Sequence, residues 1–113
     1  MGDKKVLQRE QRSEKEKMTK HLEHKFKDSL REVNFNHFDG VKYVFIFDNG
    51  YGASVIKCSN SYGGLKDLWE LAVLKRNGNG EYYINYDTPI TNEVLGYLSD
   101  SEVNNYLSQI KEL

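Results

Sequence analysis

The sequence predicts an α+β protein with an N-terminal helix, a four-stranded antiparallel meander sheet, and C-terminal helices packed on one face of the sheet. Three observations lead to this prediction. Apolar residues recur at helical spacing before residue 34, and four short runs rich in aromatic and β-branched residues follow, separated by Gly-rich turns. The chain then ends in a second stretch with apolar residues at helical spacing.

The beginning of the chain divides into two parts. Residues 1–17 are almost entirely charged or polar, so we expect a charged arm that is frayed or disordered. Residues 18–113 are expected to form a single α+β domain, since a chain of 113 residues suffices for one modest core. Within it, apolar residues spaced by three or four predict a helix from Met18 to about Val33. They are Met18, Leu22, Phe26, Leu30 and Val33.

Four strands are expected next, at residues 41–47, about 53–59, 68–75 and 81–86. The short turns between them favour an antiparallel meander. Asn49-Gly50 and Asn79-Gly80 predict type I′ hairpin turns, in which both central residues have positive φ. The first and third turns should lie at the same end of the sheet, and the S-Y-G-G turn at residues 61–64 should lie at the other.

The end of the chain carries the signals of a capped helix. Ser99 and Glu102 form the pattern of a capping box, and apolar residues at helical spacing follow up to Leu113. The segment just before it, residues 87–98, is expected to form a turn and a short helix, with Pro89 in the first turn.

Composition limits the location and the chemistry. Sixteen Lys and Arg nearly balance seventeen Asp and Glu, which is short of the dense basic charge of a dedicated nucleic-acid binder. The single cysteine, Cys58, cannot form an internal disulfide, which favours a reducing cytoplasmic location. No apolar run is long enough to span a membrane, so we expect no membrane association.

The patterns that resemble catalytic or metal sites are better explained by structure. A strand follows the D-N-G-Y-G turn, whereas a phosphate-binding loop is followed by a helix. His21 and His24 lie one helical turn apart but supply only two metal ligands. Cys58 has no base placed beside it by the sequence. We therefore expect no catalytic, cofactor-binding or metal-binding residues, and a protein that is not an enzyme.

The tyrosines suggest a binding surface. Five of them cannot all enter one small core, and tyrosine is enriched where proteins meet. These are Tyr51, Tyr62, Tyr82, Tyr83 and Tyr86. They could form a partner-binding face or a homodimer interface; the alternative is a set of ordinary cross-strand pairs on a half-exposed sheet. The candidate partner-binding residues are Asp48, Asn49, Tyr51, Tyr62, Tyr82 and Tyr83 on the sheet, and Lys20, His24 and Lys27 on the N-terminal helix.

Residues 43–113 contain the recurring pieces F-D-N-G-Y-G-A-S-V, S-Y-G-G, L-W-E-L-A-V-L and D-T-P-I-T. In these pieces the chain resembles a group of small uncharacterised proteins carried by bacteriophages and prophages of Gram-positive bacteria. The resemblance implies a phage origin and a place in the cytoplasm of the host bacterium. It implies no activity and no catalytic residue.

Two functions remain open from the sequence. The first is a phage-derived, non-enzymatic interaction protein that binds and inhibits a host macromolecule, in the manner of an anti-CRISPR protein. Its partner would be a host protein such as a CRISPR effector or another defence component. The alternative is a nucleic-acid-binding protein that uses the basic N-terminal helix. Acidic residues interspersed with the basic ones, such as Glu16 and Glu23, argue against this alternative.

Overall fold

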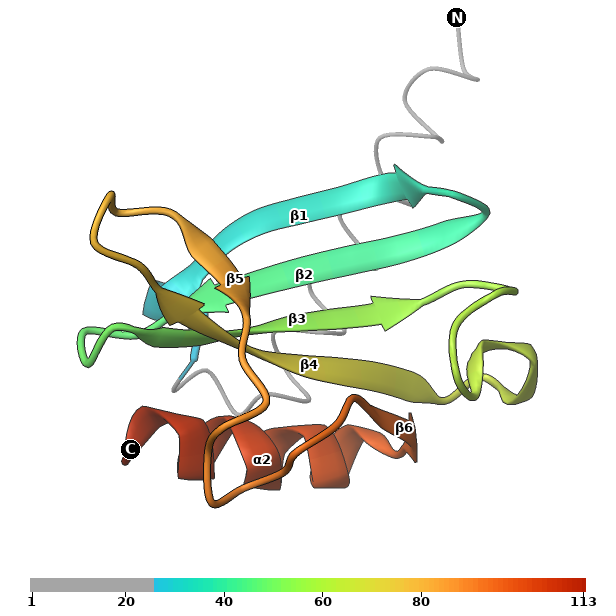
Figure 1. Cartoon of the computed structure of the whole chain (residues 1–113). Coiled ribbons are helices and arrows are strands. Elements are labelled where there is room, and N and C mark those ends of the chain that lie inside the picture. The colour runs from blue at the N-terminus through green and yellow to red at the C-terminus, as the bar shows by residue number, and fades with distance from the viewer. Residues whose placement is uncertain (1–25) are drawn as a thin grey trace, which may run out of the picture.

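The computed structural model describes residues 26–113, which form one antiparallel sheet and one α-helix (Figure 1). The strands are β1 (Leu30–His37), β2 (Gly40–Ile46), β3 (Tyr51–Lys57), β4 (Trp69–Arg76), β5 (Tyr82–Ile84) and β6 (Leu95–Leu98). β1 to β5 follow one another as a meander, and β6 pairs with β4. The helix is α2 (Asp100–Lys111), and two short 3-10 turns are η1 (Lys27–Ser29) and η2 (Gly64–Lys66).

The prediction of a four-stranded sheet preceded by one helix and followed by others is therefore wrong, because the sheet of the described residues has six strands. The first error concerns the N-terminal helix. Residues 18–25 lie outside the described part of the chain, and Leu30 to Val33 begin β1. Leu30 and Val33 still pack against the core, so the apolar spacing did mark inward-facing residues. The backbone there is extended because it pairs with β2, where Val33 lies opposite Tyr43. Pairing with a neighbouring strand overrides the local helical pattern.

The predicted short helix before residue 99 is also wrong. Residues 87–94 contain no helix, and Leu95 to Leu98 form β6. β6 pairs with the beginning of β4, with Leu98 opposite Trp69, while β5 pairs with the end of the same strand. Two short strands thus share one edge of β4. A single helix, α2, remains where two C-terminal helices were expected.

The hairpin turns differ from the predicted type. Gly50 and Gly80 have φ values of 85° and 82°, but Asn49 and Asn79 are not among the described residues with positive φ. The N–H of Gly50 donates to the carbonyl oxygen of Phe47, 3.4 Å away, which closes the first turn. A turn of this kind followed by a left-handed glycine is a type I turn with a G1 bulge.

The predicted meeting of the first and third turns is confirmed. The N–H of Arg76 donates a hydrogen bond to the carbonyl oxygen of Gly50 at 2.9 Å, and Tyr51 lies opposite Lys75 in the β3–β4 register. We call this end of the sheet, which carries the turns at residues 47–50 and 77–80, the paired-turn end.

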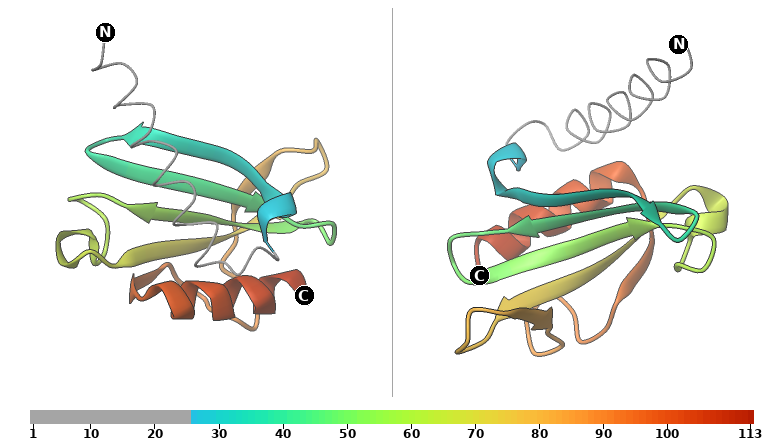
Figure 2. Two further views of the ribbon diagram at one scale, coloured as in Figure 1. Left: turned by 180° about the vertical axis from the view of Figure 1, so that it is seen from behind. Right: turned by 90° about the horizontal axis from the view of Figure 1, so that it is seen from above.

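The core lies between the sheet and α2. Alternation sends the odd-numbered residues of β2, β3 and β4 toward the helix, and Phe26 contacts Phe47 edge-on at a centroid distance of 6.0 Å. The main members are Phe26, Tyr43, Phe45, Phe47, Val55, Trp69, Leu71, Val73, Leu98, Val103, Leu107 and Ile110. No helix of the described residues covers the opposite face of the sheet (Figure 2). Nor is any helix within this part long and apolar enough to cross a membrane.

The predicted capping box at the start of α2 is confirmed. The N–H of Glu102 donates to the hydroxyl of Ser99 at 3.2 Å, and the N–H of Ser99 donates to the Glu102 carboxylate at 3.0 Å. The indole N–H of Trp69 donates to the carboxylate of Asp100 at 2.7 Å. These contacts fix the beginning of the helix against the beginning of β4.

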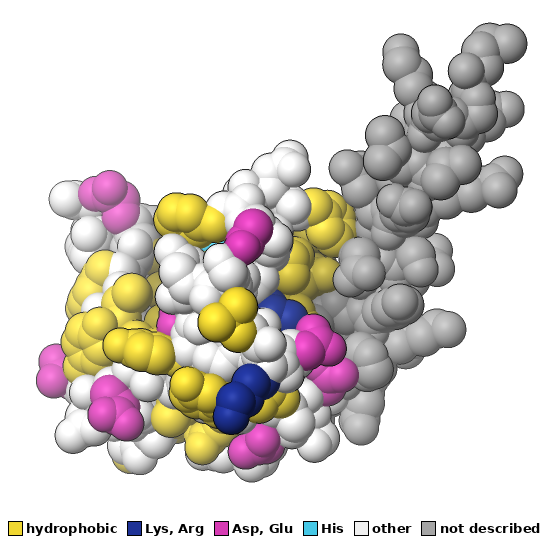
Figure 3. All heavy atoms as spheres, turned by 90° about the vertical axis from the view of Figure 1, so that its right-hand side faces the viewer, with side chains coloured by type: hydrophobic (Ala, Val, Ile, Leu, Met, Phe, Trp, Pro, Cys, Tyr) yellow, Lys and Arg dark blue, Asp and Glu magenta, His cyan; other side chains and the backbone are white. Residues whose placement is uncertain are grey.

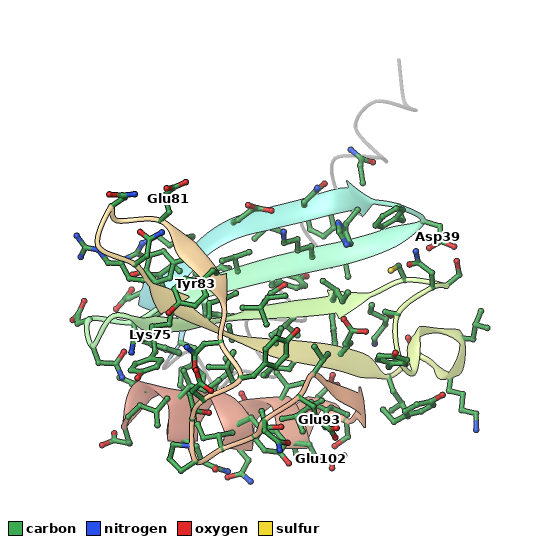
Figure 4. The ribbon with its side chains drawn as sticks, viewed as in Figure 1. Asp39, Lys75, Glu81, Tyr83, Glu93 and Glu102 are labelled. Carbon is green, nitrogen blue, oxygen red and sulfur yellow. The ribbon has the colours of Figure 1, made fainter. Side chains whose placement is uncertain are left out.

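The end of the sheet opposite the paired turns is built by two connections. One is the β1–β2 turn around Phe38 and Asp39, and the other is the long segment 58–68 between β3 and β4. The N–H of Ser59 donates to the carboxylate of Asp39 at 2.8 Å, which joins the two. We call this end of the sheet the loop end. Figure 4 shows Asp39 at the loop end and Glu81 at the paired-turn end.

Candidate functional site

Exposed hydrophobic side chains gather at the loop end. Seven large hydrophobic residues of the described chain are exposed, and five of them line this end or the hollow beside it. The five are Phe38 (71% exposed), Tyr62 (63%), Leu65 (84%), Tyr86 (48%) and Tyr97 (56%), which we call the loop-end surface. The other two, Tyr83 and Ile84, lie on β5. Figure 3 views the molecule from this side and shows hydrophobic side chains separated by polar ones, with acidic side chains toward the margin.

Three of these tyrosines surround a hollow of about 650 Å³ between the segment 58–68 and the chain leading into β6. We call it the tyrosine hollow. Its lining is Tyr62, Tyr86, Asn92, Glu93, Val94, Gly96 and Tyr97. One carboxylate among three aromatic rings is the main chemical feature of this lining.

The backbones on the two sides of the hollow touch directly. The N–H of Tyr97 donates to the carbonyl oxygen of Tyr62 at 3.0 Å. A Cβ atom on Gly63 would lie 2.8 Å from the Cα of Tyr97, and a Cβ atom on Gly96 would collide with the Cβ of Tyr62. Only glycine permits this approach, so the backbones that carry Tyr62 and Tyr97 are held close together.

Left-handed backbone is concentrated at the same end. Three non-glycine residues of the described chain have positive φ: Phe38 at 54°, Asp67 at 61° and Tyr97 at 57°. All three lie at the loop end or on β6 beside it. Left-handed conformations cost a non-glycine residue roughly 1–3 kcal/mol each and are common at functional sites. Two of the three, Phe38 and Tyr97, also belong to the loop-end surface.

A second hollow, of about 520 Å³, lies at the same end between the β1–β2 turn and η2. Its polar groups are held by neighbours. The ammonium of Lys57 lies 3.0 Å from the Asp67 carboxylate and 4.2 Å from the ring centroid of Trp69. Hydrogen bonds from the hydroxyl and N–H of Ser59 hold the pKa of Asp39 below its ordinary value. These contacts hold the connections of the loop end together.

Cys58 begins the loop-end segment and is buried. Its Sγ lies 2.9 Å from Oδ1 of Asn60, and its N–H donates to the hydroxyl of Ser61 at 3.0 Å. An amide oxygen accepts a hydrogen bond but does not act as the base that a nucleophilic thiol requires. Within residues 26–113, no three His, Cys, Asp or Glu side chains lie together as metal ligands would.

The structure divides the predicted partner-binding residues between the two ends. Tyr62 lies at the loop end, while Asp48 is exposed at the tip of the first turn of the paired-turn end. Tyr51 and Tyr83 lie opposite Lys75 on its two neighbouring strands, and Figure 4 shows Lys75 and Tyr83 at the paired-turn end. The Lys75 ammonium lies 5.5 Å from the Tyr51 ring centroid. The predicted residues therefore do not form one surface.

The remaining predicted residues have other positions. The side-chain amide of Asn49 donates to the carbonyl oxygens of Ile110 and Lys111 at 2.9 and 3.1 Å, so it caps the end of α2. Tyr82 is half-buried opposite Arg76 on β4, and Lys27 is exposed in η1. Lys20 and His24 lie outside the described residues, as do the histidine pair and the arm.

Four residues of the loop-end surface were not among the predicted partner-binding candidates, although one of them, Tyr86, belonged to the wider set of tyrosines that suggested a binding surface. Tyr97 fell within the stretch expected to be helical, and nothing in its sequence neighbourhood indicates left-handed backbone. Phe38 lies between the predicted helix, which ends at about Val33, and the first predicted strand, which begins at residue 41. Leu65 did carry a usable signal, because it is an apolar residue directly after two glycines and before Lys66 and Asp67.

Comparison with protein-family models, with curated proteins and with solved structures gave no match. The resemblance to the phage group therefore stays a prediction. The candidate site rests on the geometry of the loop end alone.

Proposed function

We propose that the protein acts by binding another protein through the loop-end surface, without catalysis. The observation that carries this proposal is the coincidence of exposed large hydrophobic residues with left-handed backbone at Phe38 and Tyr97. Exposed aromatic and aliphatic side chains gain free energy when a partner covers them. Tyrosine and phenylalanine are enriched at such interfaces.

The backbone at the loop end supports a rigid docking surface. Direct contact between residues 62–63 and 96–97 fixes the backbone of two of the tyrosines before any partner arrives. A surface that is already ordered loses less entropy on binding, which raises affinity for the same contacts. Left-handed non-glycine residues lower the stability of the folded protein, and such a cost is typical of a site selected for binding.

The nature of the partner follows from the resemblance to phage proteins. On that basis we propose a host macromolecule in the bacterial cytoplasm, and an inhibitory effect through steric cover of its working surface. A protein of a defence system, such as a CRISPR effector, is the first partner to test. A homodimer formed through the same surface is the other outcome.

Charge does not favour nucleic acid as the partner of the described residues. Residues 26–113 carry eight Lys and Arg against twelve Asp and Glu. Binding to a phosphate backbone requires an excess of basic side chains along one surface. The alternative from the sequence thus depends on the basic residues before Phe26, which lie outside the described part.

The test is affinity capture from a nuclease-treated lysate of a Gram-positive bacterium, with three forms of the full chain. These are the unchanged protein, the double variant Tyr62→Ser with Leu65→Ser, and the matched control Tyr83→Ser with Ile84→Ser. Circular dichroism confirms that each form is folded. We expect the loop-end variant to lose at least about tenfold in captured partner and the control to retain it. Retention by the loop-end variant, with loss by the control, would move the site to β5.

A further inference from the structure

Building on the proposed function, we propose that the tyrosine hollow receives a Lys or Arg side chain of the partner protein. The cation would lie against the faces of Tyr62, Tyr86 and Tyr97 and beside the carboxylate of Glu93. The partner surface that fits the loop end is therefore apolar with a protruding basic residue.

The aromatic rings provide the first part of this recognition. A ring face carries partial negative charge and attracts an ammonium or guanidinium group within about 6 Å of its centroid. The protein already contains such a contact at this site, since the Lys66 ammonium lies 6.0 Å from the Tyr97 ring centroid. The three rings that line the hollow are each about half exposed or more, so a second cation can reach them.

Glu93 provides the second part. Its backbone is fixed by Thr91, whose hydroxyl accepts from the Glu93 N–H at 3.1 Å and donates to the Glu93 carbonyl oxygen at 3.0 Å. Its carboxylate makes no ion pair or side-chain hydrogen bond within residues 26–113, so it is available to a partner. Figure 4 shows Glu93 on the segment between β5 and β6. By contrast, the carboxylate of Glu70 is already occupied by the N–H of Tyr62 at 3.0 Å.

The same features disfavour other occupants of the hollow. An anionic group would be repelled by Glu93. A purely apolar side chain would remove water from that carboxylate without giving it a partner, which costs free energy. A basic side chain satisfies the carboxylate and covers the rings with its methylene chain.

The inference can be tested without knowing the partner, by titrating the ¹⁵N-labelled full chain with N-acetyl-arginine amide and N-acetyl-lysine amide. N-acetyl-glutamine amide serves as the neutral control. We expect saturable shifts at the amides of Tyr62, Glu93, Gly96 and Tyr97 with the two cations and none with the control. Glu93→Gln should weaken binding at least about threefold, and the matched variant Glu81→Gln at the paired-turn end should not.

Equal shifts with the neutral control, or unchanged binding by Glu93→Gln, would overturn the inference. This failure differs from failure of the proposed function. If the loop-end double variant loses the captured partner while the cations do not bind, docking stands and cation recognition falls. If the cations bind but the loop-end variant retains its partner, both the proposed function and the role of the hollow in recognising that partner fall.

Discussion

The backbone N–H of Tyr97 donates a hydrogen bond to the carbonyl oxygen of Tyr62, 3.0 Å away. This bond joins β6 to the segment between β3 and β4, two stretches that are distant in sequence. It also holds the backbones from which two exposed rings extend, because Tyr62 and Tyr97 are the two residues in the bond. The loop-end surface therefore depends on backbone contact rather than on the packing of its own side chains.

Substitution of Gly96 should break this relationship. In Gly96→Ala the new methyl group collides with the Cβ of Tyr62, so we expect a loss of about 1–3 kcal/mol in the free energy of unfolding. Gly78→Ala is the matched control, since no atom lies within 4 Å of its added Cβ and its φ is not positive. We expect a change within about 0.5 kcal/mol there. Urea denaturation measures both, and equal effects would argue against a tight contact.

Tyr97 should tolerate glycine better than other exposed tyrosines do. Its φ of 57° costs a residue with a Cβ about 1–2 kcal/mol, which Tyr97→Gly removes. Tyr83→Gly in β5 relieves no such strain and should be more destabilising by at least about 1 kcal/mol. Denaturant unfolding of the two variants gives the difference. A larger loss at Tyr97 would mean that the lost contacts of its ring outweigh the relief of the left-handed strain, which would contradict the prediction.

Asn49 should contribute to stability rather than to partner binding. Its side chain donates to carbonyl oxygens at the end of α2, so Asn49→Ala leaves those groups without this donor. We expect a cost of about 1–2 kcal/mol. Asn79 occupies the equivalent position of the other type I turn, and Asn79→Ala is expected to cost clearly less. Unchanged partner capture by Asn49→Ala, alongside its lower stability, would confirm the assignment.

The capping box should make stability depend on pH in the acid range. Hydrogen bonds from the N–H and hydroxyl of Ser99 lower the pKa of Glu102 in the folded protein below its ordinary value of 4.5. The resulting stabilisation is therefore fully present above the unfolded pKa and is lost as pH falls through the folded pKa. Glu102→Gln should be less stable than the unchanged protein at pH 7, with the difference shrinking by about pH 3.

Urea unfolding at both pH values measures this difference. Repeating the comparison in a Ser99→Ala background provides the control, because the side-chain hydrogen bond to the Glu102 carboxylate is then missing while the backbone N–H of residue 99 remains. We expect a smaller pH-dependent difference in that background. A difference of the same size would assign the whole effect to the backbone N–H of residue 99 and none to the hydroxyl.

The sequence was informative where local chemistry decides the structure. Ser99 and Glu102 identify the helix start because a capping box needs only residues close in sequence. The aromatic and β-branched runs identified β2, β3 and β4 because buried strands require such residues on the face toward the core. The turn glycines at 50 and 80 were placed correctly, although the type of turn was not.

The errors arose where distant segments decide the structure. Leu30 and Val33 face the core in either a helix or a strand, and only the pairing with β2 distinguishes the two. β6 is a strand because it pairs with the part of β4 that β5 leaves unpaired. A short window of sequence around β6 contains no information about this distant partner. Most of the loop-end surface was missed for the same reason, since its residues come from three separate connections and from β6.

The central claim is that the loop end, and not the paired-turn end, contacts the partner. Hydrogen exchange of the full chain, alone and in complex with the captured partner, tests this claim most directly. We expect slower exchange in the complex at residues 37–40, 59–68 and 95–98, with residues 47–51 and 76–82 unchanged. Slower exchange confined to residues 47–51 and 76–82 would contradict the claim and assign binding to the opposite end of the sheet.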